Sequence, residues 1–304
     1  MVQGLAAVLE PADLTVIVNT GDDFVHYGLN ISPDLDTVCY TLAGMVDPIK
    51  GWGINHDTYA ILDSLVKMGG PGWFSIGDSD LCTHLERTRR FTEGSTLTDI
   101  TADFSKQWGI EYIVLPMTDD NVSTLVETEE FGLISFQEYF VKHKFEPRVK
   151  NLLYQGLESA KPTRNVIQSL EQCDAVVICP SNPFLSIDPI IKIQGISELI
   201  NEKFVLCVSP IIQNKCIKGP LSKILVELGF SSDQESIINH YRKLLNLFVF
   251  DQKDIDTFSI DPSSGIMTYA TDIYLPDLNS RSRLAKEVIG LLDKYVVKNE
   301  LDQL

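Results

Sequence analysis

The order of apolar and polar residues along the chain alternates between two patterns. Short runs rich in β-branched or aromatic residues predict buried strands at 14–19, 73–76, 110–115, 175–179, 204–208 and 247–250. Apolar residues that recur every three or four positions predict helices at 2–9, 35–44, 55–68, 79–90, 96–108, 164–172, 221–228 and 280–297. Strands separated by helices of this length indicate a doubly wound, mostly parallel sheet covered on both faces. We therefore predict an α/β fold.

Residues 117–161 depart from this alternation. Strand-like runs at 122–126 and 133–136 are mixed with polar and aromatic residues, and no helix separates them clearly. We interpret this segment as an α+β insertion or cap subdomain. Residues 1–116 and 162–304 would then form the α/β core.

The stretch 15–37 holds the densest group of candidate functional residues. A strand ends there at Asn19, and four acids follow within 15 positions: Asp22, Asp23, Asp34 and Asp36. Ligands of open α/β sheets lie at the carboxyl ends of strands. Clustered carboxylates suit Mg²⁺ and, through it, a phosphate or diphosphate. The pattern favours a metal site at this strand end.

A helix start offers a second interpretation of half of this stretch. Ser32 is a good N-cap, Pro33 fits the first helical position, and Asp34 suits the positive end of the helix dipole. This interpretation does not account for Asp22 and Asp23.

Polar or turn-forming residues follow four of the predicted strands. In a parallel sheet these ends lie on one edge and can line a single cleft. The alternative is that serine, asparagine and proline are simply common where strands end. The residues concerned are Asn19, Thr20, Gly77, Asp78, Ser181, Asn182 and Ser209.

Basic and histidine side chains give weaker candidates. His26, close to the first acid pair, is a candidate base or hydrogen-bond donor, and His84 either contacts an anion or is structural. We expect the arginines of the 79–90 helix to face solvent, although one could reach a phosphate. Two lysines after Ser209 are candidates to close over a ligand. These basic residues are Arg87, Arg89, Arg90, Lys215 and Lys218.

Composition narrows the classes of function. The chain has 304 residues, 44% of them hydrophobic, which is ordinary for a globular protein. Its net charge of −17 repels nucleic acid and anionic membrane, so we expect neither as a partner. The six cysteines lack metal-site spacing, and we expect reduced thiols in a cytoplasmic protein. No apolar stretch approaches the about 20 residues that span a bilayer.

Six motifs, in combination and in order, resemble those of the 2-phospho-L-lactate transferase family, which acts in the biosynthesis of the deazaflavin coenzyme F-420. The motifs are Asn-Thr-Gly-Asp-Asp (19–23), Ile-Ser-Pro-Asp-Leu-Asp-Thr (31–37), Trp-Gly-Ile (52–54), Gly-Asp-Ser-Asp-Leu-Cys-Thr-His (77–84), Pro-Ser-Asn-Pro (180–183) and Ser-Pro-Ile-Ile (209–212).

The resemblance implies a Rossmann-like fold, a need for Mg²⁺ and a defined reaction. A guanylyl-diphosphate donor that carries lactate, enolpyruvate or a glycerate would pass its phospho-acid to the hydroxyl of 8-hydroxy-5-deazariboflavin, and GMP would leave. The four aspartates resemble the metal and acceptor-hydroxyl cluster, with one of them available as general base. Residues 77–84 resemble the deazaflavin-binding segment and Ser181 with Asn182 a nucleotide contact. The expected substrate-binding residues are Asn19, Thr20, Asn30, Gly77, Asp78, Ser79, Asp80, Thr83, His84, Ser181, Asn182 and Ser209.

Two departures from the family pattern keep other hypotheses open. Ser79 stands where many members have arginine, and Met1 falls inside the first helix of the pattern, after the expected strand and glycine-rich loop. We expect the natural protein to carry about 10–20 further residues at its front. The alternatives are a nucleotide-sugar-binding regulatory homologue without transferase activity and an inactive truncated fragment. The motif at 31–37 favours the transferase. A homodimer is one of the assemblies that the sequence allows.

Overall fold

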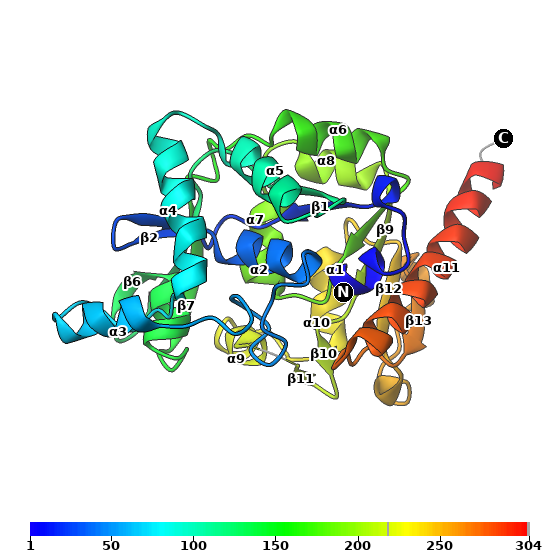
Figure 1. The fold of residues 1–304 in the computed structure, drawn as a ribbon. Helices are drawn as coiled ribbons and strands as arrows, with labels where there is room; N and C mark the ends of the chain where they lie inside the picture. Colours follow the sequence, from blue (N-terminus) through cyan, green and yellow to red (C-terminus); the bar gives the residue numbers. More distant parts are fainter. Residues whose placement is uncertain (218, 303–304) are drawn as a thin grey trace. The chain divides into compact units, whose positions relative to one another are not determined.

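The computed structural model describes residues 1–217 and 219–302, and the elements are labelled in Figure 1. The chain divides into two compact units. The first unit is Thr15–Val166, and the second unit combines Met1–Leu14 with Ile167–Leu304. Each is a layered arrangement of strands and helices, which confirms the predicted α/β class.

Two parallel strands form the centre of the first unit. β1 (Thr15–Val18) pairs with β4 (Ile113–Pro116) in the register Thr15 to Ile113. Buried side chains such as Ile100 and Phe104 of α5 provide the adjoining core. The helices of this part are α2 (Pro33–Leu42), α3 (Ala60–Lys67), α4 (Asp78–Thr92) and α5 (Leu97–Gln107).

A separate antiparallel sheet of three strands lies within 117–161. Its order is β6-β5-β7, with β5 (Ser123–Thr128), β6 (Gly132–Ser135) and β7 (Val149–Gln155). The short helical segment η2 (Glu138–Lys142) connects β6 to β7. This antiparallel pairing explains why the segment lacks the strand–helix alternation of its flanks.

The second unit contains a parallel sheet of four strands in the order β13-β12-β9-β8. The strands are β8 (Ala175–Ile178), β9 (Phe204–Val208), β12 (Leu247–Asp251) and β13 (Met267–Thr271). All five residues of β9 and of β12 are buried, as expected of inner parallel strands. The helices are α6 (Arg164–Gln172), which begins before the unit boundary, α7 (Asp188–Ile191), α8 (Ile196–Asn201), α9 (Leu221–Glu227), α10 (Gln234–Tyr241) and α11 (Leu278–Asp302).

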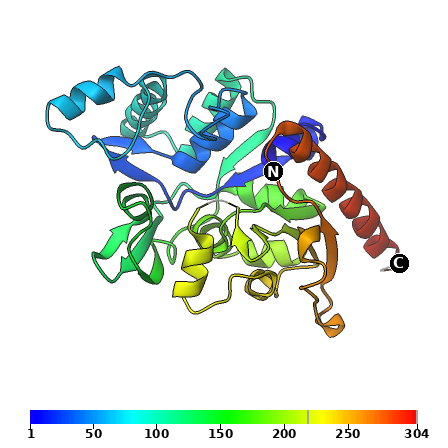
Figure 2. The ribbon, with the colours of Figure 1, turned by 90° about the horizontal axis from the view of Figure 1, so that it is seen from below.

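Helix α11 covers the sheet of the second unit and also contacts the start of the chain. Its Leu284 and Val288 belong to the core formed with β9 and β12. α1 (Val2–Ala6) lies beside it, as both ribbon views show (Figures 1 and 2). A Cβ on Gly4 would lie 2.2 Å from the Arg281 carbonyl oxygen, so this contact requires glycine.

The predicted strand at 73–76 is wrong. Trp73 and Phe74 lie in a loop, and their rings pack against Phe24 at 6.0 and 4.9 Å between ring centroids. Gly77 and Asp78 therefore open helix α4 and do not end a strand. Packing of aromatic rings, rather than strand pairing, explains the apolar run.

The structure also contains short elements that the periodicity did not reveal. They are α10, β7, β13, β2 (Phe24–His26) paired with β3 (Leu29–Ile31), β10 (Ile211–Ile212) paired with β11 (Lys215–Cys216), and the single turns η1 (Pro11–Asp13), η3 (Pro183–Ile187), η4 (Gln252–Asp254) and η5 (Pro262–Ser264). Lys215 starts β11, and Lys218 lies outside the described residues.

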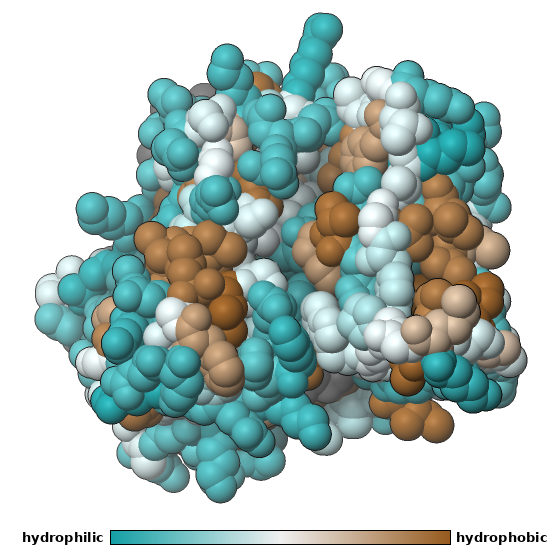
Figure 3. Space-filling model, turned by 90° about the vertical axis from the view of Figure 1, so that its left-hand side faces the viewer, coloured by the Kyte–Doolittle hydropathy of each residue, from teal (hydrophilic) through white to brown (hydrophobic). Residues whose placement is uncertain are grey.

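The surface carries apolar side chains that no core covers. Helix α3 has no buried residue, and its Ile61 and Val66 are exposed, as is Met68 just beyond it. Figure 3 shows such side chains gathered in separate patches on one face. None of the helices in the described part of the chain combines the length and the apolar character needed to cross a bilayer.

Candidate active site

The end of β1 and the start of α2 bring the two acid pairs together. Asn19, directly after β1, donates from Nδ2 to Asp34 Oδ2 at 3.0 Å. Ser32 Oγ donates to Asp23 Oδ2 at 2.6 Å. Ser32 precedes α2, yet its side chain makes no capping hydrogen bond to that helix. The helix-cap interpretation therefore does not account for the side chain of Ser32, whose hydroxyl donates instead to Asp23, which follows β1.

Three of the four acids have a raised pKa. Burial, followed by the charges of Asp34 and Asp23, raises the pKa of Asp22 well above its usual range, against the lowering effect of the polar side chains of Asn19 and Thr124. Burial likewise raises the pKa of Asp23, which the Ser32 hydrogen bond and the Arg87 charge oppose. Burial also raises the pKa of Asp34. We call Asp22, Asp23 and Asp34 the acid cluster.

The acid cluster has unused oxygen atoms. Asp22 Oδ1 and Asp23 Oδ1 are buried, and neither has a hydrogen-bond partner among the residues that the structure describes. Such atoms are costly to bury unless something binds them. A hard divalent cation satisfies carboxylate oxygens and removes their mutual repulsion, so the chemistry of the cluster fits Mg²⁺.

Asp36 is held differently from the other three acids. Arg87, 2% exposed, binds both of its oxygens: Nη1 donates to Asp36 Oδ2 at 3.1 Å and Nη2 to Oδ1. The same Nη1 donates to the Asn30 carbonyl oxygen at 3.3 Å, and Asn30 N donates to Thr88 Oγ1 at 2.8 Å. Asp36 thus belongs to a buried ion pair that anchors α2 to α4.

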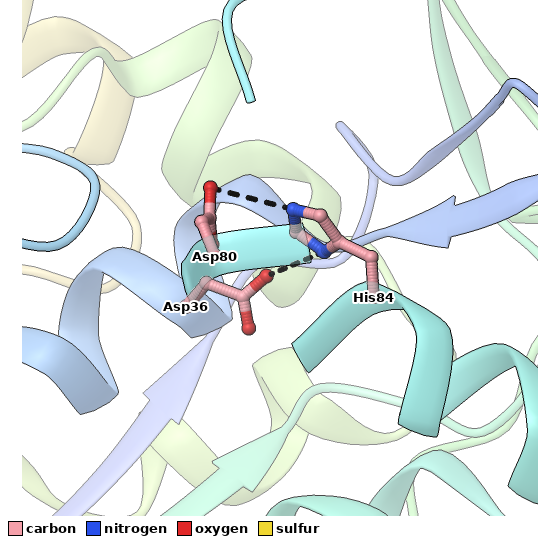
Figure 4. A group of neighbouring side chains, drawn as sticks. All are labelled: Asp36, Asp80 and His84. Carbon is pink, nitrogen blue, oxygen red and sulfur yellow. Dashed lines mark ion pairs between the residues drawn. The ribbon is translucent and has the colours of Figure 1, made fainter. Parts of the chain in front are cut away.

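His84 extends this ion pair toward the start of α4 (Figure 4). Its Nδ1 lies 3.6 Å from Asp36 Oδ2 and its Nε2 3.4 Å from Asp80 Oδ2. Tyr40 OH donates to Asp80 Oδ1 at 2.7 Å. Burial would raise the pKa of Asp80, but the neighbouring His84 imidazole and the Tyr40 hydrogen bond hold it below its usual range.

Asp36, Asp80 and His84 each place a ligand-type atom within 4.8 Å of the others. Both Asp36 oxygens are nevertheless bound by Arg87, and a metal ion beside that guanidinium would be repelled. We therefore interpret these side chains as a buried polar network that supports α2, rather than as a metal site.

Two aspartates, Asp78 and Asp57, each cap the N-terminus of a neighbouring helix. Asp78, the first residue of α4, accepts from Ala60 N at 3.0 Å and Ile61 N at 3.0 Å, and so caps α3. Asp57, which precedes α3, accepts from Ser79 N at 2.8 Å and Asp80 N at 3.0 Å, and so caps α4. A Cβ on Gly77 would lie 2.1 Å from Asp57 Oδ2.

Within 77–84, most side chains serve the structure around the acid cluster. Asp80, Thr83 and His84 are buried in the polar network, whereas Ser79 is exposed. Thr20 is also buried, and its Oγ1 has no hydrogen-bond partner within the described ranges.

His26 is surrounded by aromatic rings. Its ring centroid lies 4.8 Å from that of Tyr27 and 5.1 Å from that of Trp73. Burial lowers its pKa, which favours the neutral imidazole. His26 therefore packs the β2–β3 hairpin against the loop that holds Trp73.

The remaining expected residues belong to the second unit. Asn182 Oδ1 accepts from Phe184 N at 3.0 Å and caps η3, while its buried Nδ2 has no partner in the part of the chain that is described. Ser209 is fully buried and donates to Gln234 Oε1 at 2.5 Å. Ser181 is half-buried. That the strand ends of both units line one cleft stays a prediction.

The expectation that Arg87 faces solvent is wrong, since it is 2% exposed, and sequence reasoning did not identify Tyr40 or Asp57. Asp80, His84 and Arg87 are spaced four and three positions apart, which places them on one face of a helix. That spacing of opposite charges was the available signal for an internal ion pair. Asp57 and Tyr40 have no comparable signal, because their partners are 23 and 40 positions away.

An α/β fold with acids at a strand end is typical of enzymes that bind small ligands at the carboxyl edge of a sheet, and comparison with known proteins identifies the family. The model of the family described as 2-phospho-L-lactate transferase CofD matches residues 1–283. The chain therefore belongs to the 2-phospho-L-lactate transferase family and is a transferase.

The relatives that match almost the whole chain carry one of two different names. It is 36% identical to the 2-phospho-L-lactate transferase of Methanosarcina acetivorans over 294 residues, 96% of this chain and 95% of the relative. It is 34% identical to the phosphoenolpyruvate transferase of Streptomyces coelicolor over 299 residues, 96% of this chain and 94% of the relative.

The fold also resembles a solved structure. A UPF0052 family protein from Bacillus halodurans superposes with a TM-score of 0.61 at 14% identity, covering 95% of this chain and 94% of the other. At that identity the likeness concerns the fold alone.

Proposed function

We propose that the protein transfers a phospho-acid from a guanylyl-diphosphate donor to the hydroxyl of 8-hydroxy-5-deazariboflavin, in the biosynthesis of coenzyme F-420. The new bond joins the acceptor oxygen to the phosphorus of the phospho-acid. The diphosphate P–O bond breaks, and GMP leaves. The observation that carries this proposal is the acid cluster with its two unpartnered oxygens at the end of β1.

Mg²⁺ is the cofactor that we propose for this step. Asp22, Asp23 and Asp34 would hold it, and it would neutralise the charge of the diphosphate. The protein's own net charge of −17 makes such neutralisation necessary for a diphosphate to enter. Arg87 holds Asp36 in place, and through Asp36 it fixes the start of α2, where Asp34 lies.

A carboxylate of the cluster also takes the proton of the acceptor hydroxyl. A raised pKa makes a carboxylate a stronger base, as general base catalysis requires. Phosphoryl transfer needs in-line positioning and charge neutralisation more than covalent help, and these residues supply both.

Product formation with defined donors tests the proposal. The protein is incubated with 8-hydroxy-5-deazariboflavin, GTP, Mg²⁺ and one phospho-acid with its guanylyltransferase, and products are identified by mass spectrometry. Separate reactions contain 2-phospho-L-lactate, phosphoenolpyruvate or a phosphoglycerate, because the relatives' names differ in the acid. We expect the deazaflavin ester of one acid together with GMP.

Variants decide whether the acid cluster does the chemistry. Asp34→Ala should slow transfer by about 10² or more, because it removes a carboxylate of the acid cluster. Asp36→Ala should also slow transfer, but through loss of the ion pair with Arg87 that fixes the start of α2. Asp63→Ala, which removes an exposed carboxylate from α3, is the matched control. Full turnover by both variants would contradict the role of the cluster. Binding of a nucleotide sugar without any product would instead support the regulatory homologue.

A further inference from the structure

A pocket of about 300 Å³ opens in the second unit. Its lining comes from the segments directly after three neighbouring parallel strands: β9 ends at Val208, β12 at Asp251 and β13 at Thr271. Ligands of open α/β sheets bind at these carboxyl ends, so the pocket lies where the fold favours a site. The lining residues are Ile212, Lys215, Cys216, Ile217, Lys253 and Tyr274.

Buried polar side chains fix the walls of this pocket. Gln234, 3% exposed, donates from Nε2 to the Ile211 carbonyl oxygen at 2.9 Å and to Asp254 Oδ2 at 2.7 Å. Asp254 also accepts from Gln213 N at 3.1 Å. These bonds tie the loop after β9 to the turn η4 after β12. The backbone that carries both lysines is therefore held before any ligand arrives.

The two lysines of the pocket are uncompensated. Within the described residues, neither Lys215 nor Lys253 has a side-chain ion pair or hydrogen bond, although the protein carries a net charge of −17. The nearest acids along the chain already accept hydrogen bonds. Asp251 accepts from Lys253 N and Ile273 N, and Asp254 Oδ2 accepts from Gln234 Nε2. Two ammonium groups beside one cavity favour an anion.

The other lining residues are apolar or aromatic. Tyr274 is 51% exposed and Ile217 37% exposed, so their side chains present surface rather than core. A flat ring packs well against a tyrosine ring and branched aliphatic side chains. A volume of about 300 Å³ is at the lower end of small-molecule sites.

We propose that this pocket binds an organic phosphate that carries an aromatic ring. The phosphate lies between Lys215 and Lys253, and the ring lies against Tyr274, Ile212 and Ile217. None of these residues belongs to the acid cluster, so binding to this pocket can be measured separately from the transfer reaction. The same chemistry is present in a nucleotide and in a simple aryl phosphate.

Calorimetric titration with phenyl phosphate tests the pocket. The Lys215→Gln/Lys253→Gln double variant should bind at least 10-fold more weakly than the wild type, and Tyr274→Leu should also weaken binding. Lys286→Gln removes an exposed charge of α11 in the same unit and should leave the affinity unchanged. Inorganic phosphate should bind at least 10-fold more weakly than phenyl phosphate, because it lacks the ring.

Alkylation of Cys216, which lines the pocket, locates the bound molecule. Phenyl phosphate should protect this thiol from iodoacetamide, as followed by peptide mass spectrometry, and leave the exposed Cys82 unprotected. If GMP also protects Cys216, the natural ligand of the pocket is a nucleotide. If only phenyl phosphate protects it, the natural ligand is a different aryl phosphate. Equal affinity in the double-lysine variant, equal binding of inorganic phosphate, or no binding of phenyl phosphate would each overturn the proposal.

Discussion

The buried pair of Arg87 and Asp36 allows a quantitative test of how the acid cluster is supported. In Arg87→Met the volume of the side chain is largely kept, but both Asp36 oxygens lose their donors and the Asn30 carbonyl loses one. The side chains of Arg87 and Asp36 are 3% and 8% exposed, so water cannot replace these bonds. The substitution leaves a buried negative charge beside Asp23.

Removing one partner of a buried ion pair costs about 3–5 kcal/mol, because the remaining charge stays desolvated. We expect Arg87→Met to lower the free energy of unfolding by that amount. The double variant Arg87→Met/Asp36→Asn removes both charges and should be less destabilised than the sum of the single variants. A coupling of about 2 kcal/mol is the expected size for groups in one buried network.

Tryptophan fluorescence during urea unfolding measures this effect in the relevant unit. The chain has three tryptophans, and Trp52, Trp73 and Trp108 all lie in the first unit, Thr15–Val166. Arg89→Met is the matched control on the same helix, because Arg89 pairs with Glu86 and Glu93 at the surface. A change below about 1 kcal/mol for Arg87→Met, or additive single variants, would refute the reasoning.

Three further predictions concern the acid cluster and the caps. Because the pKa of Asp22 is raised in the folded state, the stability contributed by its protonated carboxyl is fully present below the unfolded pKa of about 4 and is lost as pH rises through the native pKa. Asp22→Asn should therefore gain stability relative to wild type as pH rises above about 4 in EDTA, whereas a constant difference would contradict the raised pKa. Mg²⁺ should raise the melting temperature, and a guanine nucleotide should raise it further only with metal present; Asp34→Asn should abolish the Mg²⁺ effect, and equal nucleotide stabilisation in EDTA would count against a metal bridge. Asp57→Ala should cost about 1 kcal/mol of unfolding free energy, measured by the same fluorescence, through the lost cap of α4, and an unchanged value would show that water replaces it.

The sequence predicted most of the long elements because their burial leaves a clear pattern. β9 and β12 are buried on both faces, so their residues form unbroken apolar runs, and α6 was predicted at its observed bounds. The β2–β3 hairpin has strands of three residues, too short for a period to be detected. The run at 73–76 looked like a strand because its aromatic residues favour strands, but here they pack on β2.

The candidate site was predictable where it depends on neighbours in the chain. The acids after β1 and at the start of α2 meet because both lie at one strand end. The ion pair of Asp36 depends instead on how α4 lies against α2, across 51 positions. No local pattern records such a contact, and we expected Arg87 at the surface for that reason.

The exchanged caps of Asp57 and Asp78 make helix α3 an exchangeable module. The start of α3 is pinned by Asp78 and the start of α4 by Asp57, through side chains that lie outside α3 itself. Helix α3 contributes no buried residue, so the rest of the unit places little demand on its sequence. Reporter peptides or another helix should therefore be accepted in place of α3, provided that the loop with Trp73 and Phe74 keeps its packing on Phe24. In engineering terms, α3 is the part near the buried network that can be replaced with the least effect on it.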